Sequence, residues 1–151
     1  MPASVCTCTI PSATRYLARV RRFVDEQATA AGLSEKAASE VQLAVDEACA
    51  NAIEHAYGGD AGGTVEVVTK RAPGRFVVVI RHTGVPFDIS KYQPPDLARA
   101  ADERWSGGFG VALMHRLMDE VAYRRRGRVS EVHLVKFLNG DGKPARDGGA
   151  R

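Results

Sequence analysis

The feature that most constrains the fold is a run of small apolar residues between positions 37 and 56. Alanine and valine recur there at intervals of three and four, the spacing of one face of an α-helix. The stripe consists of Ala37, Val41, Ala44, Val45, Ala48, Ala52 and Ala56. Because most of these side chains are small, the helix can lie close to whatever covers it. Ser34 is a suitable N-cap for its first turn.

Three polar residues run beside this apolar stripe. Glu47, Asn51 and His55 are spaced four apart, so each lies about 40° around the helix from the one before. A carboxylate and a carboxamide oxygen one turn apart are a good start for a hard cation such as Mg²⁺. On spacing alone, a solvated helix edge is the competing interpretation.

The remaining pattern gives the order of the other elements. A strand is expected over 1–10, and Pro11 with Ser12 ends it. Ser12 is a possible N-cap for a helix that runs to about residue 31, where Gly32 stops it. The further expected elements are strands at 64–70 and 75–82, an irregular segment at 83–108, a helix at 109–119, and a hairpin of 121–126 with 129–138. This order predicts an α+β fold, a two-layer sandwich with helices on one face of a mixed, mostly antiparallel sheet.

Length and composition set the class of protein. A chain of 151 residues fits one domain, expected over 1–138, with a disordered tail over 139–151. The formal net charge of +3 is too small to argue for direct nucleic-acid binding. The most basic run, Arg124 to Arg126 with Arg128, is interpreted as a solvated hairpin end.

Cysteine usage and hydropathy bear on the compartment. The three cysteines form no disulfide framework and no CxxC pair, so a reducing, cytoplasmic setting is expected. No segment approaches the roughly 20 apolar residues that span a bilayer, so no membrane association is expected.

Two further segments strengthen the case for a site. GGFG at 107–110 lies between the irregular segment and a helix start, where glycines and helix N-terminal amides can approach a phosphate. HTGVPFD at 82–88 leaves a strand into a turn. Either segment alone is a weak signal, but together with the polar row, in this order, they are much more specific.

These segments resemble the GHKL (Bergerat-fold) ATPases, and within them the small bacterial anti-sigma factor serine kinases of partner-switching regulation. The strongest part is LAVDEACANAIEHAYGG at 43–59, which resembles the family's N-box; GVPFD at 84–88 and GGFGVALMHRLMDEVAYRR at 107–125 support it. The resemblance covers nearly the whole chain up to about residue 138.

The resemblance implies roles for individual residues. Glu47 would orient or deprotonate the attacking hydroxyl, and Asn51 would hold Mg²⁺ over the triphosphate of ATP. The loop Gly108-Phe109-Gly110 would close on the phosphates. His55 matches a residue common in the N-box, although packing or capping would explain it equally well.

The chain departs from the family at the base-reading motif. The family uses a motif of the form Asp-x-Gly to read adenine, whereas this chain has His82-Thr83-Gly84. A neutral imidazole offers one acceptor nitrogen, so His82 can keep part of the bond to the adenine amino group. Losing a buried acceptor costs about 1–3 kcal/mol, a tenfold to hundredfold loss of affinity. Weakened ATP binding, altered nucleotide choice and a partner-binding domain without turnover all remain open.

A second departure concerns an arginine that precedes the glycine loop in some family kinases. Its position here is Ser106, and Arg104 lies two residues earlier. Arg104 either replaces it through loop flexibility or is a surface charge.

The resemblance therefore implies an anti-sigma regulatory factor that phosphorylates a serine of an anti-anti-sigma (STAS-type) partner, using ATP and Mg²⁺. The alternative is a catalytically weakened or nucleotide-independent module of the same fold that binds such a partner or a sigma factor. Family members are commonly homodimers, so a homodimer is expected.

Overall fold

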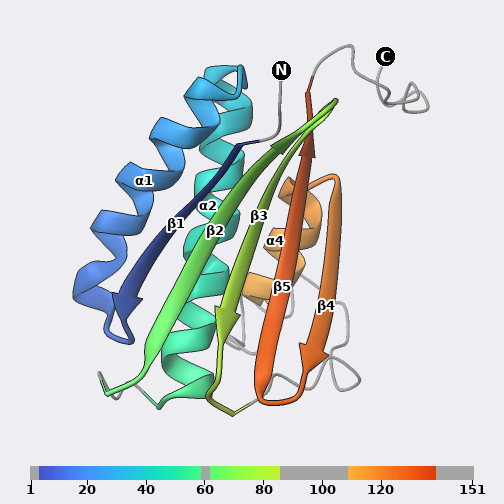
Figure 1. Cartoon of the computed structure of the whole chain (residues 1–151). Helices are drawn as coiled ribbons and strands as arrows, with labels where there is room; N and C mark the ends of the chain where they lie inside the picture. Colours follow the sequence, from blue (N-terminus) through green and yellow to red (C-terminus); the bar gives the residue numbers. More distant parts are fainter. Residues whose placement is uncertain (1–3, 59–61, 86–108, 139–151) are drawn as a thin grey trace.

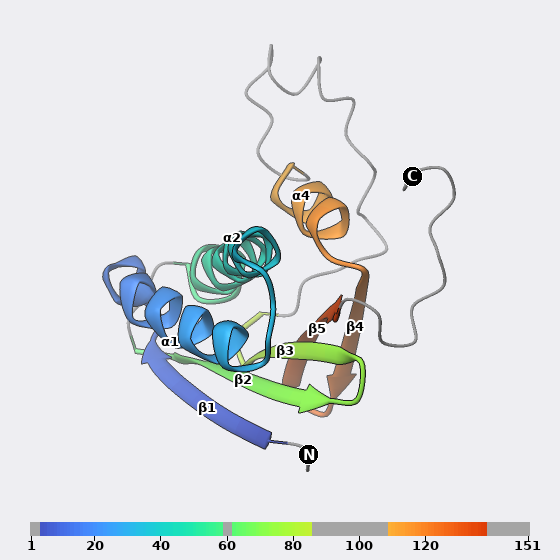
Figure 2. The same cartoon turned by 90° about the horizontal axis from the view of Figure 1, so that it is seen from above.

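The computed structural model describes residues 4–58, 62–85 and 109–138. Five strands form one sheet in the order β1-β2-β3-β5-β4, and all four pairings are antiparallel. The elements are β1 (Ser4–Pro11), a 3₁₀ turn (Thr14–Tyr16), α1 (Leu17–Ala30), α2 (Glu35–Asn51), a π-helix (Ala52–Ala56), β2 (Thr64–Ala72), β3 (Arg75–His82), α4 (Phe109–Leu117), β4 (Glu120–Arg126) and β5 (Val129–Phe137). All the described α-helices lie on one face of the sheet (Figures 1 and 2), which confirms the α+β fold class.

The core lies between the sheet and α2. Alternate residues of β2 and β3, such as Val67, Val78 and Ile80, are fully or almost fully buried on the helix side. They meet the predicted stripe of α2, in which Ala44 and Val45 are likewise buried. Burying each such valine or isoleucine contributes about 1.5–3 kcal/mol. The small side chains of α2 therefore bring its backbone close to the sheet, as the sequence predicts.

The opposite face of the sheet carries an ion-pair network. Glu66, Arg81 and Glu131 are neighbours in register on adjacent strands. Arg81 Nε donates to Glu131 Oε2 at 2.7 Å, and its Nη1 donates to Glu66 Oε1 at 3.1 Å. His133 Nε2 lies 2.7 Å from the other oxygen of Glu131. Hydrogen bonds from His133 and then from Arg81 lower the pKa of the Glu131 carboxyl. The sheet face that no described helix covers thus carries this network, beside the buried Val68 and Val79.

The predicted start of the first helix is wrong. The N-cap of the 3₁₀ turn that precedes α1 is Ala13, and Ser12 pairs with the start of β2. The Ser12 backbone N–H donates to the carbonyl of Gly63 at 3.0 Å, and its Oγ accepts from Gly63 N at 3.1 Å. These bonds continue the β1–β2 pairing by one residue, and α1 begins only at Leu17. Ser34, by contrast, caps α2 as predicted, because its Oγ accepts from Ala37 N at 3.1 Å.

The predicted solvated end of the basic hairpin is confirmed. Arg124, Arg125, Arg126 and Arg128 are exposed around the β4–β5 turn at Gly127. None of the helices within the described ranges is long and apolar enough to cross a membrane. The tail predicted at 139–151 lies outside the described residues.

Candidate functional site

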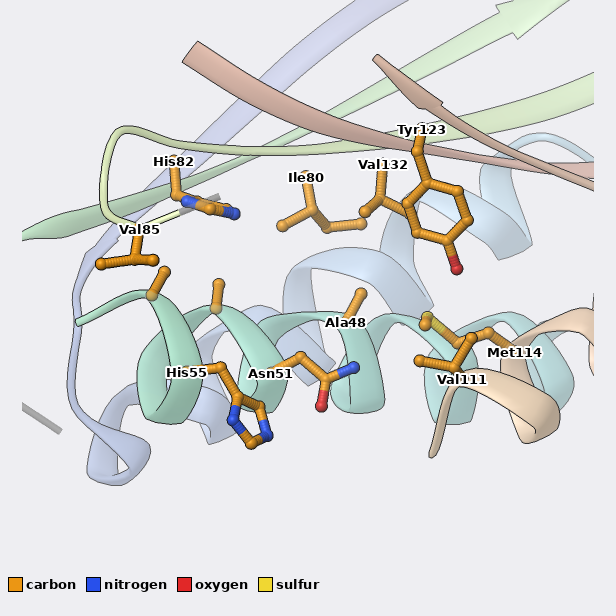
Figure 3. Close-up of a pocket in the computed structure, with 12 residues that line it drawn as sticks. Ala48, Asn51, His55, Ile80, His82, Val85, Val111, Met114, Tyr123 and Val132 are labelled. Carbon is orange, nitrogen blue, oxygen red and sulfur yellow. The ribbon is translucent and has the colours of Figure 1, made fainter. Parts of the chain in front are cut away.

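A small cavity, with about 30 Å³ of space open to the centre of a water molecule, lies between α2, α4 and the sheet (Figure 3). Its described walls are mostly aliphatic. Among the lining residues are Ala48 and Asn51 from α2, Ile80 and His82 from β3, and Val111 and Met114 from α4. Polar groups therefore occur at few positions around an apolar hollow, which is the usual character of a small-molecule site.

Glu47 lies at the junction of α2 with the first turn of α4. A Cβ atom placed on Gly110 would be 2.9 Å from Glu47 Oε1, so only a glycine leaves the carboxylate its present place. The pKa of the Glu47 carboxyl is raised, chiefly by burial and then by the charges of Asp46 and Glu54. A raised pKa makes the carboxylate a better proton acceptor, as a general base requires.

Asn51 is the last residue of α2, one turn beyond Glu47, and it lines the cavity. Figure 3 shows its amide group extending towards Val111 and Met114 of α4. Among the described residues, neither Glu47 nor Asn51 has a hydrogen-bond partner. Their oxygen atoms are therefore available to a ligand or a metal ion.

The predicted polar row does not continue as a regular α-helix to His55. Residues Ala52–Ala56 form a π-helix, which takes more residues per turn than an α-helix. His55 is consequently exposed, and Figure 3 shows its ring pointing away from the strands, although it still lines the rim of the cavity. The structure thus keeps Glu47 and Asn51 at helical spacing but moves His55 off their line.

His82 closes the cavity at the end of β3. It is 8% exposed, and its buried Nδ1 has no hydrogen-bond partner in the part of the chain that the structure describes. Burial lowers the pKa of this imidazole, so the neutral ring is favoured near pH 7. A buried polar atom without a partner is uncommon and costs about 1–3 kcal/mol, so His82 stands out among the residues that line the cavity.

Gly84 brings the turn after β3 against the end of α2. A Cβ at Gly84 would lie 2.5 Å from the carbonyl oxygen of Ala56, and the next residue, Val85, donates its N–H to that same oxygen at 2.9 Å. The glycine in the predicted motif is therefore required by packing of backbone on backbone.

Sequence reasoning missed Tyr57. Its hydroxyl donates to Thr64 O and accepts from Thr83 N, both at 2.9 Å. Its ring meets that of His82 edge-on, with the centroids 6.0 Å apart. The only signal in the sequence was its place directly before the glycines that follow α2.

Three predicted site residues cannot be placed in full. Arg104 and Gly108 lie outside the described residues. Phe109 begins α4, but its side chain is not described.

The described residues fit a ligand with a flat heteroaromatic end and an anionic end. The partnerless His82 nitrogen and the aliphatic walls suit the first. The N-terminus of α4, with no Cβ at Gly110, suits the second, and the oxygens of Glu47 and Asn51 suit an accompanying cation. A nucleotide with Mg²⁺ has this chemistry.

Comparison with known proteins defines the class. Residues 10–136 match the profile of the Histidine kinase-like ATPase domain. The fold is similar to the crystal structure of the RsbU and RsbW domains of Rv1364c from Mycobacterium tuberculosis, with a TM-score of 0.62 and 18% sequence identity. The superposition includes 96% of this chain and 34% of that longer chain. The chain belongs to the histidine kinase-like ATPase domain family.

Within this family, the chain is similar to proteins named serine-protein kinase RsbW. It is 31% identical over 136 residues to the protein from Bacillus subtilis (strain 168), covering 87% of this chain and 84% of the relative. It is 34% identical over 134 residues to a relative from Bacillus licheniformis, covering 85% and 83%. The resemblance predicted from the N-box and the glycine loop is thereby confirmed.

Proposed function

We propose that this protein is an anti-sigma regulatory factor that transfers the γ-phosphoryl group of ATP to a serine of an anti-anti-sigma partner. The observation that carries the proposal is the position of Glu47: its Oε1 would lie 2.9 Å from a Cβ atom placed on Gly110, in the first turn of α4, and its carboxyl has a raised pKa. The similarity to proteins named serine-protein kinase RsbW supports the reaction class.

The roles follow from the chemistry of each side chain. The serine oxygen attacks the γ-phosphorus, the bond from that phosphorus to the β–γ bridging oxygen breaks, and ADP leaves. Glu47 receives the proton of the serine hydroxyl. When bound, Mg²⁺ neutralises phosphate charge, and the Asn51 oxygen would help to hold it.

The other candidate residues would bind the nucleotide. His82 and Gly84 would form the base end, with His55 at the rim. Gly108, Phe109 and Gly110 would approach the phosphates, and Arg104 would contribute a positive charge. Catalysis in such a site comes from positioning and charge neutralisation.

The test is phosphoryl transfer with the full chain. Incubation with γ-labelled ATP, Mg²⁺ and the cognate partner should place one label on a serine of the partner. The Glu47→Gln variant should bind ATP but leave the partner unlabelled. A wild-type protein that binds ATP and partner but transfers no label would contradict the kinase proposal.

A second candidate function is a partner-binding module of the same fold, without turnover. The observation that favours it is the imidazole of His82 in place of a carboxylate. Calorimetry with ATP and Mg²⁺ distinguishes the two functions: tight partner binding that is indifferent to ATP supports the module, and micromolar ATP affinity that depends on Mg²⁺ supports the kinase.

The proposed assembly is a homodimer that binds the anti-anti-sigma protein or a sigma factor. Sedimentation of the free chain, and of the chain with each partner, measures these states directly. A monomer at all concentrations tested would overturn the dimer without affecting the kinase proposal.

A further inference from the structure

The base end of the cavity has an unusual polar composition. Twelve residues line the cavity, and no carboxylate or cationic side chain other than an imidazole is among the described ones. On the sheet wall, His82 carries a ring nitrogen that is buried and partnerless. A ligand edge that reaches this wall therefore meets an imidazole and no acceptor-only group.

The orientation of the His82 ring is fixed by packing. Tyr57 contacts it edge-on at an interplanar angle of 72°, and the Tyr57 hydroxyl is itself held by Thr64 and Thr83. A rotation of the imidazole would therefore change its edge-on contact with a tyrosine ring that is itself held in place. Figure 3 shows it on the sheet side of the hollow, beyond Ile80 and beside Val85.

The protonation pattern of the ring is not fixed in the same way. No described residue forms a hydrogen bond with either ring nitrogen of His82, so nothing selects one neutral tautomer. The two neutral tautomers exchange the roles of donor and acceptor between Nδ1 and Nε2. Among the described residues Nδ1 is enclosed, whereas Nε2 is not among the buried partnerless atoms, so Nε2 is the nitrogen that can satisfy a ligand donor in one tautomer and a ligand acceptor in the other.

We propose that His82 makes this cavity a purine site that accepts both 6-amino and 6-oxo purine nucleotides. The inference rests on the proposed nucleotide binding and specifies its substrate class. An adenine presents an amino donor at position 6, and a 6-oxopurine presents a carbonyl acceptor there. An imidazole that changes its tautomer can form a hydrogen bond with either the amino group or the carbonyl. A carboxylate only accepts hydrogen bonds, so it binds the amino group and repels the carbonyl.

Inosine triphosphate is the sharpest probe, because it differs from ATP only in the amino-to-oxo exchange at position 6 and the proton that this places on N1. Calorimetry with the full chain and Mg²⁺ should give dissociation constants for the two nucleotides within about tenfold of each other. The His82→Asp variant should shift the ratio at least about tenfold in favour of ATP, equivalent to about 1.4 kcal/mol. The readout is binding, so it does not depend on phosphoryl transfer.

The matched control is His82→Asn, because a carboxamide offers both a donor and an acceptor and should keep the two affinities close together. His82→Leu offers neither and should weaken both nucleotides equally, which provides a second test if the Asp variant does not fold. Thermal unfolding of each variant establishes that it is native before its affinities are compared.

The outcomes separate this inference from the proposed function. ATP binding with inosine triphosphate more than about a hundredfold weaker, or a ratio that His82→Asp leaves unchanged, overturns the inference and leaves the kinase proposal standing. Failure of both nucleotides to bind the wild-type chain overturns both. Comparable affinities that only His82→Asp separates support the inference.

Discussion

The two ends of the cavity are built in different ways. At the base end, Tyr57, Thr83 and Val85 are joined to neighbouring segments by hydrogen bonds of 2.9 Å, and Gly84 packs directly on the carbonyl of Ala56. Near α4, two side chains have no hydrogen-bond partner among the described residues: that of Asn51, which lines the cavity, and that of Glu47, which lies beside Gly110. Contacts within the chain hold the base end together, whereas the polar side chains near α4 are not bonded to other described residues.

Because of this difference, substitutions at one end should mainly lower the stability of the fold, and substitutions at the other should mainly lower activity. Disturbing the hydrogen-bonded end breaks contacts that hold α2, β2 and β3 together, so it should cost folding free energy. Disturbing the α4 end removes groups that make few contacts in the folded chain, so it should cost activity with little loss of stability. The following predictions test the comparison, from the largest expected effect to the smallest.

The largest effect is expected at Glu47. Glu47→Gln keeps the shape of the side chain but removes the proton acceptor, so phosphoryl transfer should fall about 10²–10⁴-fold. Urea unfolding should change little, because no described residue bonds to the carboxylate. A variant that loses stability in proportion to activity would show that the α4 end is structural after all.

A matched pair of glycine-to-alanine substitutions, one at each end, compares the two ends most directly. Gly84→Ala sets a methyl group 2.5 Å from a backbone oxygen that cannot move away, and should destabilise the fold by about 1–3 kcal/mol. Gly110→Ala meets only the end of the Glu47 side chain, at 2.9 Å, and a helix favours alanine over glycine by up to about 1 kcal/mol.

Gly110→Ala should therefore unfold at the same urea concentration as the wild type or a higher one, yet lose phosphoryl transfer because the carboxylate is displaced. Equal loss of stability in both glycine variants would remove the distinction between the two ends.

A smaller loss of stability is expected for Tyr57→Phe. The ring remains, but Thr83 N and Thr64 O lose their partner. Because both bonds lie at the surface, this loss should lower the free energy of unfolding by about 0.5–1.5 kcal/mol. Tyr16→Phe is the control, since that hydroxyl has only a contact of 3.4 Å with Arg15 at the surface. Urea unfolding measures both variants, and an equal loss of unfolding free energy in Tyr57→Phe and Tyr16→Phe would contradict the prediction.

The smallest effect is a dependence of stability on pH. Burial lowers the pKa of His82 and of His115, so below about pH 6.5 the unfolded chain binds protons that the native chain resists. Their contribution is fully present above pH 6.5 and is lost as pH falls through the native pKa values. The lowered pKa of Glu131 acts in a separate window, below its ordinary value of 4.5.

Urea unfolding between pH 5 and 8 measures this slope, and His82→Asn should make it shallower. An unchanged slope in that variant would mean that the imidazole at the base end titrates as freely in the native chain as in the unfolded one.

Much of the architecture was predictable from local pattern. The apolar run within 75–82 predicted β3 with its observed bounds. The alanine stripe predicted most of the buried face of α2, although Ala38 is buried in place of Ala37. The spacing of Glu47 and Asn51 placed both beside that face, because helical geometry relates residues four apart without reference to the rest of the chain.

The parts that were missed depend on contacts between distant segments. Ser12 looks like a helix cap, but it pairs with Gly63, fifty-one residues away. The π-helix at Ala52–Ala56 displaces His55, and nothing in the alanine periodicity signals it. Tyr57 became a site residue only because β2 and β3 bring Thr64 and Thr83 to its hydroxyl.

The sequence by itself determined the elements, the face that each buries and the pair of polar residues beside the core, because periodicity is a local property of the chain. Only the tertiary structure decided that Glu47 meets the start of α4, and that His82 keeps a buried nitrogen without a partner. Those two facts depend on which segments fill the space around each side chain, and residues far apart in the sequence provide that packing.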